Sequence, residues 1–258
     1  MTNRPLSLII QDLENDEIPT DIPRDYTYNT VDSYVSDILG FHDSRFRNQL
    51  NAVNDDADAF FQLGALAAMR TILPTFTRRE LRRGPFVMSL TDLHQSNIFV
   101  DKDWHITCLV DLEWACSEPI EMIQPPYWLT NKTVDCIIPE VYDEPRKEFM
   151  GALEKEEAQL AGIIPLKSAI PRLSTVMEEG WRIGTFWYTL ALTSRTGIFL
   201  LFYRQIQRRI YGDQSSGPPF ITTMPWYWAQ DMPFIVMEKV EDKRLYDNRL
   251  RQAFEDDT

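Results

Sequence analysis

The sequence predicts a mainly helical fold with a small β-hairpin. Three observations support this fold class. Apolar residues recur at helical spacing through most of the 258-residue chain. Over residues 84–111 that spacing gives way to short apolar runs, which are typical of strands. The polar turn Asp101–His105 joins two of these runs and has the length of a hairpin loop.

Residues 1–30 are expected to form an extended N-terminal segment at the periphery. They contain Pro5, Pro19 and Pro23 with acidic and polar residues between them. Their one apolar run, Leu6–Ile10, could serve as a strand or an anchor.

Two helices are predicted before the strand region. The first begins at Val31, with Asn29 or Thr30 as its N-cap. The second begins near Asp55, where acidic side chains suit a helix N-terminus, and continues towards Pro74.

The remainder of the chain is predicted to be helical. A charged helix is expected from Pro145 to about Gly162, because proline suits the first turn of a helix. Apolar stripes over 173–188 and 198–210 are expected to pack as core. A loop over 212–219 precedes a helical tail over 231–258.

Composition excludes several classes of protein. The formal net charge of −13 argues against a surface for nucleic acid or anionic lipid and suits cationic ligands better. The most membrane-like stretch, 183–203, contains Arg195 and is predicted to be a core helix. Three cysteines without a Cys-x-x-Cys pair indicate neither a disulfide framework nor a zinc site, so a reducing, cytoplasmic location is expected.

Residues 91–111 carry side chains in an order that suits phosphoryl transfer. Asp92 and Asn97 precede the predicted hairpin, and Asp111 follows it directly. A hairpin brings its ends together, so Asn97 and Asp111 are expected side by side with Asp92 above them. Phosphoryl transfer uses hard oxygen ligands for Mg²⁺ and a carboxylate that accepts the proton of the attacking hydroxyl. These three residues supply both.

Two short segments carry a family resemblance. The sequence from Asp92 to Ile98 is Asp-Leu-His-Gln-Ser-Asn-Ile, and that from Val110 to Ala115 is Val-Asp-Leu-Glu-Trp-Ala. They resemble Asp-Leu-His-x-x-Asn-Ile and Ile-Asp-Trp-Glu of the aminoglycoside phosphotransferase and choline kinase families, which have the protein-kinase-like fold. The Pro125–Trp128 run also resembles fungal members of that superfamily. This motif region covers residues 84–130.

The resemblance implies roles for individual residues. Asp92 would be the catalytic base, Asn97 and Asp111 the magnesium ligands, and Glu113 a contact to substrate or to a ligand residue. The family usually has His-Gly before this aspartate, whereas this chain has Leu90-Thr91, which bears on the rigidity of the loop.

The resemblance also implies a missing part. Such kinases grip ATP with a Gly-rich flap and a strand lysine in an N-terminal β-rich lobe. This sequence has no Gly-x-Gly-x-x-Gly, and nothing before Val31 is expected to form such a sheet. Residues 31–258 are therefore expected to be a C-terminal (large) lobe alone, as a natural remnant or a truncated gene product. Mg²⁺ and ATP are the implied cofactors, and ATP binding by this chain alone is not expected.

Two hypotheses of function follow. In the first, the chain is a phosphotransferase lobe, inactive by itself, that transfers phosphate from ATP to a hydroxyl of a small molecule or protein. In the second, it is a non-catalytic binding module of pseudokinase type. Either way, a partner chain or self-association is expected to cover the exposed lobe interface, and no nucleic acid or membrane partner is expected.

Overall fold

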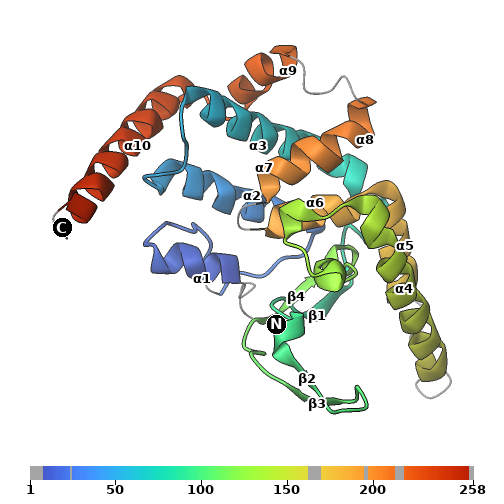
Figure 1. Ribbon diagram of the computed structural model, residues 1–258. Helices are drawn as coiled ribbons and strands as arrows, with labels where there is room; N and C mark the ends of the chain where they lie inside the picture. The colour runs from blue at the N-terminus through green and yellow to red at the C-terminus, as the bar shows by residue number, and fades with distance from the viewer. Residues whose placement is uncertain (1–7, 24, 162–169, 195–196, 213–217, 256–258) are drawn as a thin grey trace.

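Helices dominate the computed structural model, which describes residues 8–23, 25–161, 170–194, 197–212 and 218–255. The mainly helical prediction is therefore confirmed. Figure 1 shows most of the helices in the upper part of the molecule, the β2–β3 hairpin at the bottom, and α4 running down alongside the strands. The helices are α1 (Leu8–Asn15), α2 (Val31–Asn48), α3 (Asp56–Phe76), α4 (Pro139–Ala161), α5 (Leu173–Ile183), α6 (Thr185–Thr193), α7 (Ile198–Leu201), α8 (Gln207–Tyr211), α9 (Pro218–Thr223) and α10 (Met232–Glu255). The strands are β1 (Phe86–Leu90), β2 (Ile98–Val100), β3 (Ile106–Leu109) and β4 (Ala115–Pro119).

The prediction of an extended segment over residues 1–30 is wrong for the part that forms α1. Ile10 and Leu13, three residues apart, face the same side of this helix, and both are buried. They pack with Ile18 and with Phe41 of α2. This apolar cluster explains why the segment is helical and attached rather than extended and peripheral. Residues 1–7 lie outside the described part, so the expectation for Leu6 is untested.

The predicted starts of α2 and α3 are confirmed. Thr30 caps α2 by accepting a hydrogen bond from the Ser33 backbone N–H at 3.3 Å. Asp55 caps α3 in the same way, accepting from the Asp58 N–H at 2.8 Å. Each cap satisfies a backbone donor that the first helical turn leaves without a partner.

The main core lies where α2, α3, α6 and α7 meet. Its largest fully buried side chains are Trp187, Tyr142, Tyr188, Phe46, Phe76, Phe186 and Phe202. Two buried tyrosine hydroxyls in this core are satisfied by backbone carbonyls: Tyr188 donates to Met69 at 2.9 Å, and Tyr203 donates to Phe61 at 2.8 Å. α3 is long and apolar enough to cross a membrane by length and composition alone, but many of its side chains, such as Leu63 and Met69, are fully buried in this core.

Two helix boundaries differ from the prediction. α4 begins at Pro139 rather than Pro145, because the buried Tyr142 anchors an earlier first turn. The stripe over 173–188 is two helices, α5 and α6, separated by Gly184 with a positive φ of 98°. Glycine reaches this left-handed conformation without the cost that a side chain imposes.

The C-terminal region follows the prediction with one refinement. A π-helical turn, η6 (Phe202–Ile206), joins α7 to α8, so the expected helix over 198–210 is continuous with a local change of pitch. The loop is predicted over 212–219. Its residues 213–217 are outside the described part, and its last two residues are helical instead, because α9 begins at Pro218. The predicted tail helix is α10, described to Glu255.

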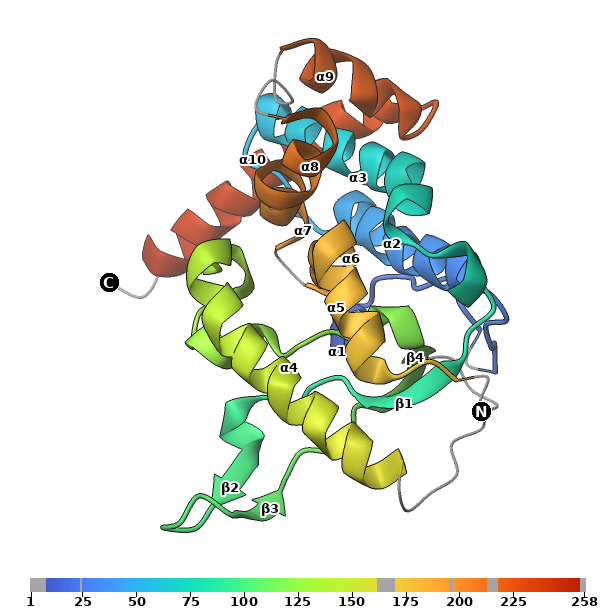
Figure 2. The same cartoon turned by 90° about the vertical axis from the view of Figure 1, so that its right-hand side faces the viewer.

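Two small antiparallel sheets form the lower part of the molecule. β2 pairs with β3 as the predicted hairpin, with Ile98 opposite Leu109. β1 pairs with β4, a strand that the sequence did not indicate, with Leu90 opposite Ala115. The hairpin extends away from the helices in both Figure 1 and Figure 2.

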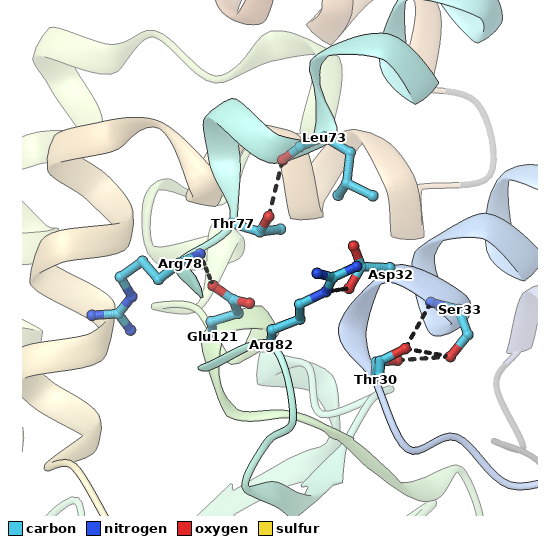
Figure 3. Close-up of polar contacts among 8 residues, drawn as sticks. All are labelled: Thr30, Asp32, Ser33, Leu73, Thr77, Arg78, Arg82 and Glu121. Atoms are coloured by element: carbon cyan, nitrogen blue, oxygen red, sulfur yellow. Dashed lines mark hydrogen bonds and ion pairs between the residues drawn. The ribbon is translucent and has the colours of Figure 1, made fainter. Parts of the chain in front are cut away.

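A set of polar contacts joins the strand region to the helices (Figure 3). The Arg78 backbone N–H donates to the buried Glu121 carboxylate at 2.9 Å, just after β4. The Arg82 guanidinium donates to Asp32 of α2 at 2.6 Å, and the Arg82 carbonyl accepts from the Val31 N–H at 2.9 Å. The segment between α3 and β1 is thereby fixed to α2 on one side and to the end of β4 on the other.

Replacement of Gly184 by alanine should destabilise the protein by about 1–3 kcal/mol. The added Cβ would lie 3.0 Å from a Phe76 ring carbon and would have to adopt the positive φ. Urea unfolding measures the change. Gly151→Ala is the matched control: Gly151 is exposed within α4 and has open space around it, so alanine should stabilise by about 0.5–1 kcal/mol. Equal midpoints for the two variants would contradict the assigned role of Gly184.

His42 should make the protein less stable in mild acid. Burial lowers the pKa of this α2 side chain from 6.5 to about 4. Between these values the unfolded chain binds a proton that the folded chain does not, so stability falls as pH falls, by about 3 kcal/mol at most. His42→Gln removes the titration. We expect the difference in unfolding free energy between wild type and variant to shrink from about pH 7 to about pH 4; a difference that does not change with pH would contradict this.

Candidate functional site

Pairing of β1 with β4 brings together two loops that are distant in sequence. β1 ends at Leu90 and β4 begins at Ala115, and these residues lie opposite each other. Directly beyond them, the backbone N–H and the hydroxyl of Thr91 both donate to the Trp114 carbonyl, at 3.3 and 2.5 Å. The start of the loop 91–97 therefore lies beside the end of the loop 110–114.

The hairpin joins these loops a second time at Asn97. The Val110 N–H donates to the Asn97 carbonyl at 3.1 Å, so the two ends of the hairpin meet as predicted. The Asn97 side chain is buried, and its amide donates to the Asp92 backbone carbonyl at 3.1 Å. Its carbonyl oxygen accepts from the Ser96 hydroxyl at 3.2 Å and has capacity for a second interaction.

Asp92 lies at the edge of a cavity of about 590 Å³. Asp92 and Tyr127, both half-buried, line this space. Burial, and then the charge of Asp92, raise the pKa of Tyr127, which keeps its hydroxyl protonated. The Trp128 indole N–H donates to the Leu93 carbonyl at 2.9 Å and so holds the loop next to Asp92 in place.

Asp111 and Glu113 lie in solvent. Both are exposed, and within the described ranges neither has a hydrogen bond or an ion pair. Asp111 has a positive φ of 55°, an uncommon conformation for a residue with a side chain. Such backbone strain is concentrated at functional sites. Asn97, Asp111 and Glu113 do not line the cavity, so Asp92 alone of the four predicted site residues borders it.

Glu118 is a cavity residue that the sequence did not reveal. It lies on β4 opposite Val87 and is 9% exposed. Burial raises its pKa, against hydrogen bonds from Ser89 and Tyr34 that lower it, and the Tyr34 hydroxyl lies 3.3 Å from the carboxylate. Cys116, two residues earlier, is buried on the same face. Recognition of β4 as a strand would have indicated this inward position.

A cluster of two aspartates and a histidine lies at the tip of the hairpin. Asp101, Asp103 and His105 are exposed, and their ligand atoms lie within 4.8 Å of one another. Asp101 also accepts hydrogen bonds from the backbone N–H groups of Asp103 and His105, at 2.8 and 2.9 Å. These hydrogen bonds stabilise the turn, and the turn itself accounts for the closeness of the three side chains.

Comparison with known proteins gives no match to any family model, any curated protein or any solved structure.

Removal of the Asn97 amide should loosen the loop that carries Asp92. In Asn97→Ala, the Asp92 carbonyl loses a buried donor, and we expect hydrogen exchange of backbone amides in 91–97 to rise roughly fivefold or more. Gln95→Ala, on the same loop, removes an exposed bond to Asn131 and should change exchange less, because water replaces it. Mass spectrometry of exchanged peptides measures both. The same exchange in both variants would show that Asn97 does not hold the loop.

Proposed function

We propose that this protein is a phosphotransferase-like protein in which Asp92 and the hairpin form the acceptor and metal side of a site for phosphoryl transfer to a hydroxyl. The observation that carries the proposal is the loop 91–97. It lines the cavity at Asp92 and is joined through Asn97 to the segment that contains Asp111. The resemblance of the same residues to aminoglycoside phosphotransferases and choline kinases supports this assignment.

Asp92 is the proposed base. Asp92 lines a cavity large enough for a small-molecule acceptor, and its carboxylate can accept a hydroxyl proton as the oxygen attacks phosphorus. General-base assistance of this kind contributes about 10²–10⁴-fold to a rate. The protonated Tyr127 hydroxyl beside it can donate to the acceptor oxygen and orient it.

Asn97 and Asp111 suit a hard cation. An amide oxygen and a carboxylate are the ligand types that Mg²⁺ takes, and Mg²⁺ retains several waters, which fits the exposed position of Asp111. The Asn97 amide nitrogen is bonded to the Asp92 carbonyl, and the amide oxygen, which accepts from Ser96, keeps a second lone pair for a cation. When bound, the ion would neutralise charge on the transferred phosphate.

A second polypeptide segment is proposed to hold ATP. Neither small sheet contains a lysine within the described residues, so these strands offer no cation for the phosphates. The hairpin exposes apolar side chains that such a unit could cover, and these are Phe99, Val100, Trp104, Ile106 and Leu109. Their exposure supports a partner chain or self-association at this face.

Metal binding separates this proposal from a non-catalytic binding module. Mn²⁺, observed by electron paramagnetic resonance with and without ATP, replaces Mg²⁺ as the probe. Asp111→Asn should weaken Mn²⁺ binding at least roughly tenfold. Asp103→Asn, at the hairpin tip, is the control and should leave it nearly unchanged. The reverse order would place the metal at the tip, and absence of Mn²⁺ binding would favour the binding module.

A further inference from the structure

The β2–β3 hairpin presents a strand edge without a partner strand. Its sheet consists of these two strands, and within the described ranges no strand pairs with the outer edge of β3. The Val110 N–H donates to the Asn97 carbonyl, so the N–H of the preceding residue, Leu109, points the opposite way, towards this edge. Both views of the molecule show the hairpin extending away from the helices (Figures 1 and 2), and all four residues of β3 are exposed.

The edge of β3 lacks two common protections against pairing with another chain. Soluble proteins often place charged side chains or proline on such edges. The sequence of β3 is Ile-Thr-Cys-Leu, which contains neither. The hairpin also exposes large apolar side chains, because Ile106 is 65% and Phe99 is 52% exposed. Since a sheet of two strands is only marginally stable, the edge is suited to the addition of a third strand.

The charges at the two ends of β3 select the strand that can be added. Asp101 and Asp103 precede β3 at the hairpin tip, Asp111 and Glu113 follow it, and all four are exposed. Lys102 is the single lysine or arginine between positions 97 and 113. An uncharged strand therefore lies between two acidic ends. Its complement is an extended segment with an apolar centre and basic residues on both sides.

The same charges argue against a second copy of this chain as the added strand. A second copy would bring its own four carboxylates to the same sheet, and each chain has a formal net charge of −13. Like charges that face one another across paired strands are destabilising. A basic segment is attracted instead, both over the distance of its approach and in the complex.

We infer that β3 is the docking edge for an extended basic segment of another polypeptide, which pairs with it as the third strand of the hairpin sheet. Main-chain hydrogen bonds to the edge hold the segment, and the acidic ends of β3 select its charge. The inference rests on the proposed function only where that function gives this partner the task of holding ATP.

A nine-residue peptide, Lys-Arg-Thr-Val-Ile-Val-Thr-Arg-Lys with blocked termini, is the probe for this edge. It is titrated into the full chain without ATP or metal, with binding measured by calorimetry and amide exchange by nuclear magnetic resonance. We expect binding that weakens as salt is added, and exchange of the Leu109 amide slowed roughly fivefold or more. The same peptide with glutamate at its four basic positions should bind at least roughly tenfold more weakly.

Two substitutions at Leu109 separate strand addition from simple charge attraction. Leu109→Pro removes the outward N–H, and proline is tolerated where an edge N–H faces solvent. Leu109→Ala is the matched control, because it loses the apolar side chain but keeps this N–H. Peptide binding should fall roughly tenfold or more in the proline variant and clearly less in the alanine variant.

Reversal of charge gives a test that does not depend on the fold of the proline variant. A double variant, Asp103→Lys with Glu113→Lys, changes one exposed carboxylate at each end of β3. It should bind the glutamate peptide more tightly than the basic one, which is the opposite of the wild-type order.

Three results would overturn the inference. Equal binding of the basic and acidic peptides to the wild-type chain would remove the role of charge. Unchanged Leu109 exchange at saturating basic peptide would show that the peptide binds elsewhere. Protection of Leu109 that increases with protein concentration, without peptide, would assign the edge to a second copy.

The outcome is distinguishable from that of the proposed phosphoryl transfer. The peptide experiment uses neither nucleotide nor metal, and the Mn²⁺ experiment uses no peptide. Mn²⁺ bound through Asp111, without peptide binding at β3, would overturn the docking edge alone. Peptide binding as described, without Mn²⁺ binding, would leave the docking edge in place and overturn the phosphotransferase.

Discussion

The antiparallel pairing of β1 with β4 is the constraint on which the candidate site depends. It places the loop that carries Asp92 beside the segment that carries Asp111, although eighteen residues lie between the two positions. It also turns Glu118 into the same cavity wall as Ser89 and Asp92. A two-stranded sheet is only marginally stable by itself. Here Leu81, Ile120 and Val176 form a buried cluster against Val87 of β1, so packing on neighbouring segments and α5 maintains the pairing.

The two sides of Asp92 differ in solvation, and this difference fits two separate tasks. The cavity side is mostly apolar and holds a buried carboxylate, Glu118, whose charge is costly without a partner. The hairpin side is open to water and presents Asp111 without a protein partner among the described residues. A hydrated divalent cation suits the exposed carboxylate of Asp111. In this proposal the base lies at the boundary between an acceptor and a metal.

Local sequence signals predicted the parts of the fold that local interactions determine. The caps at Thr30 and Asp55 and the hairpin around Asp101–His105 depend on residues a few positions apart. The features that were missed depend on distant partners. α1 is helical because Ile10 and Leu13 pack on Phe41, and β4 exists because β1 pairs with it. The inward position of Glu118, and with it the cavity, follows from that pairing and could not be predicted from the sequence of β4 itself.

The most direct measurement is the effect of bound Mn²⁺ on the relaxation of backbone amide protons in the full chain. The account places the ion at Asn97 and Asp111, so it predicts the strongest relaxation at the amides of residues 91–97 and 110–113, and loss of this effect in Asp111→Asn. Strongest relaxation at residues 101–105 of the hairpin tip would contradict it.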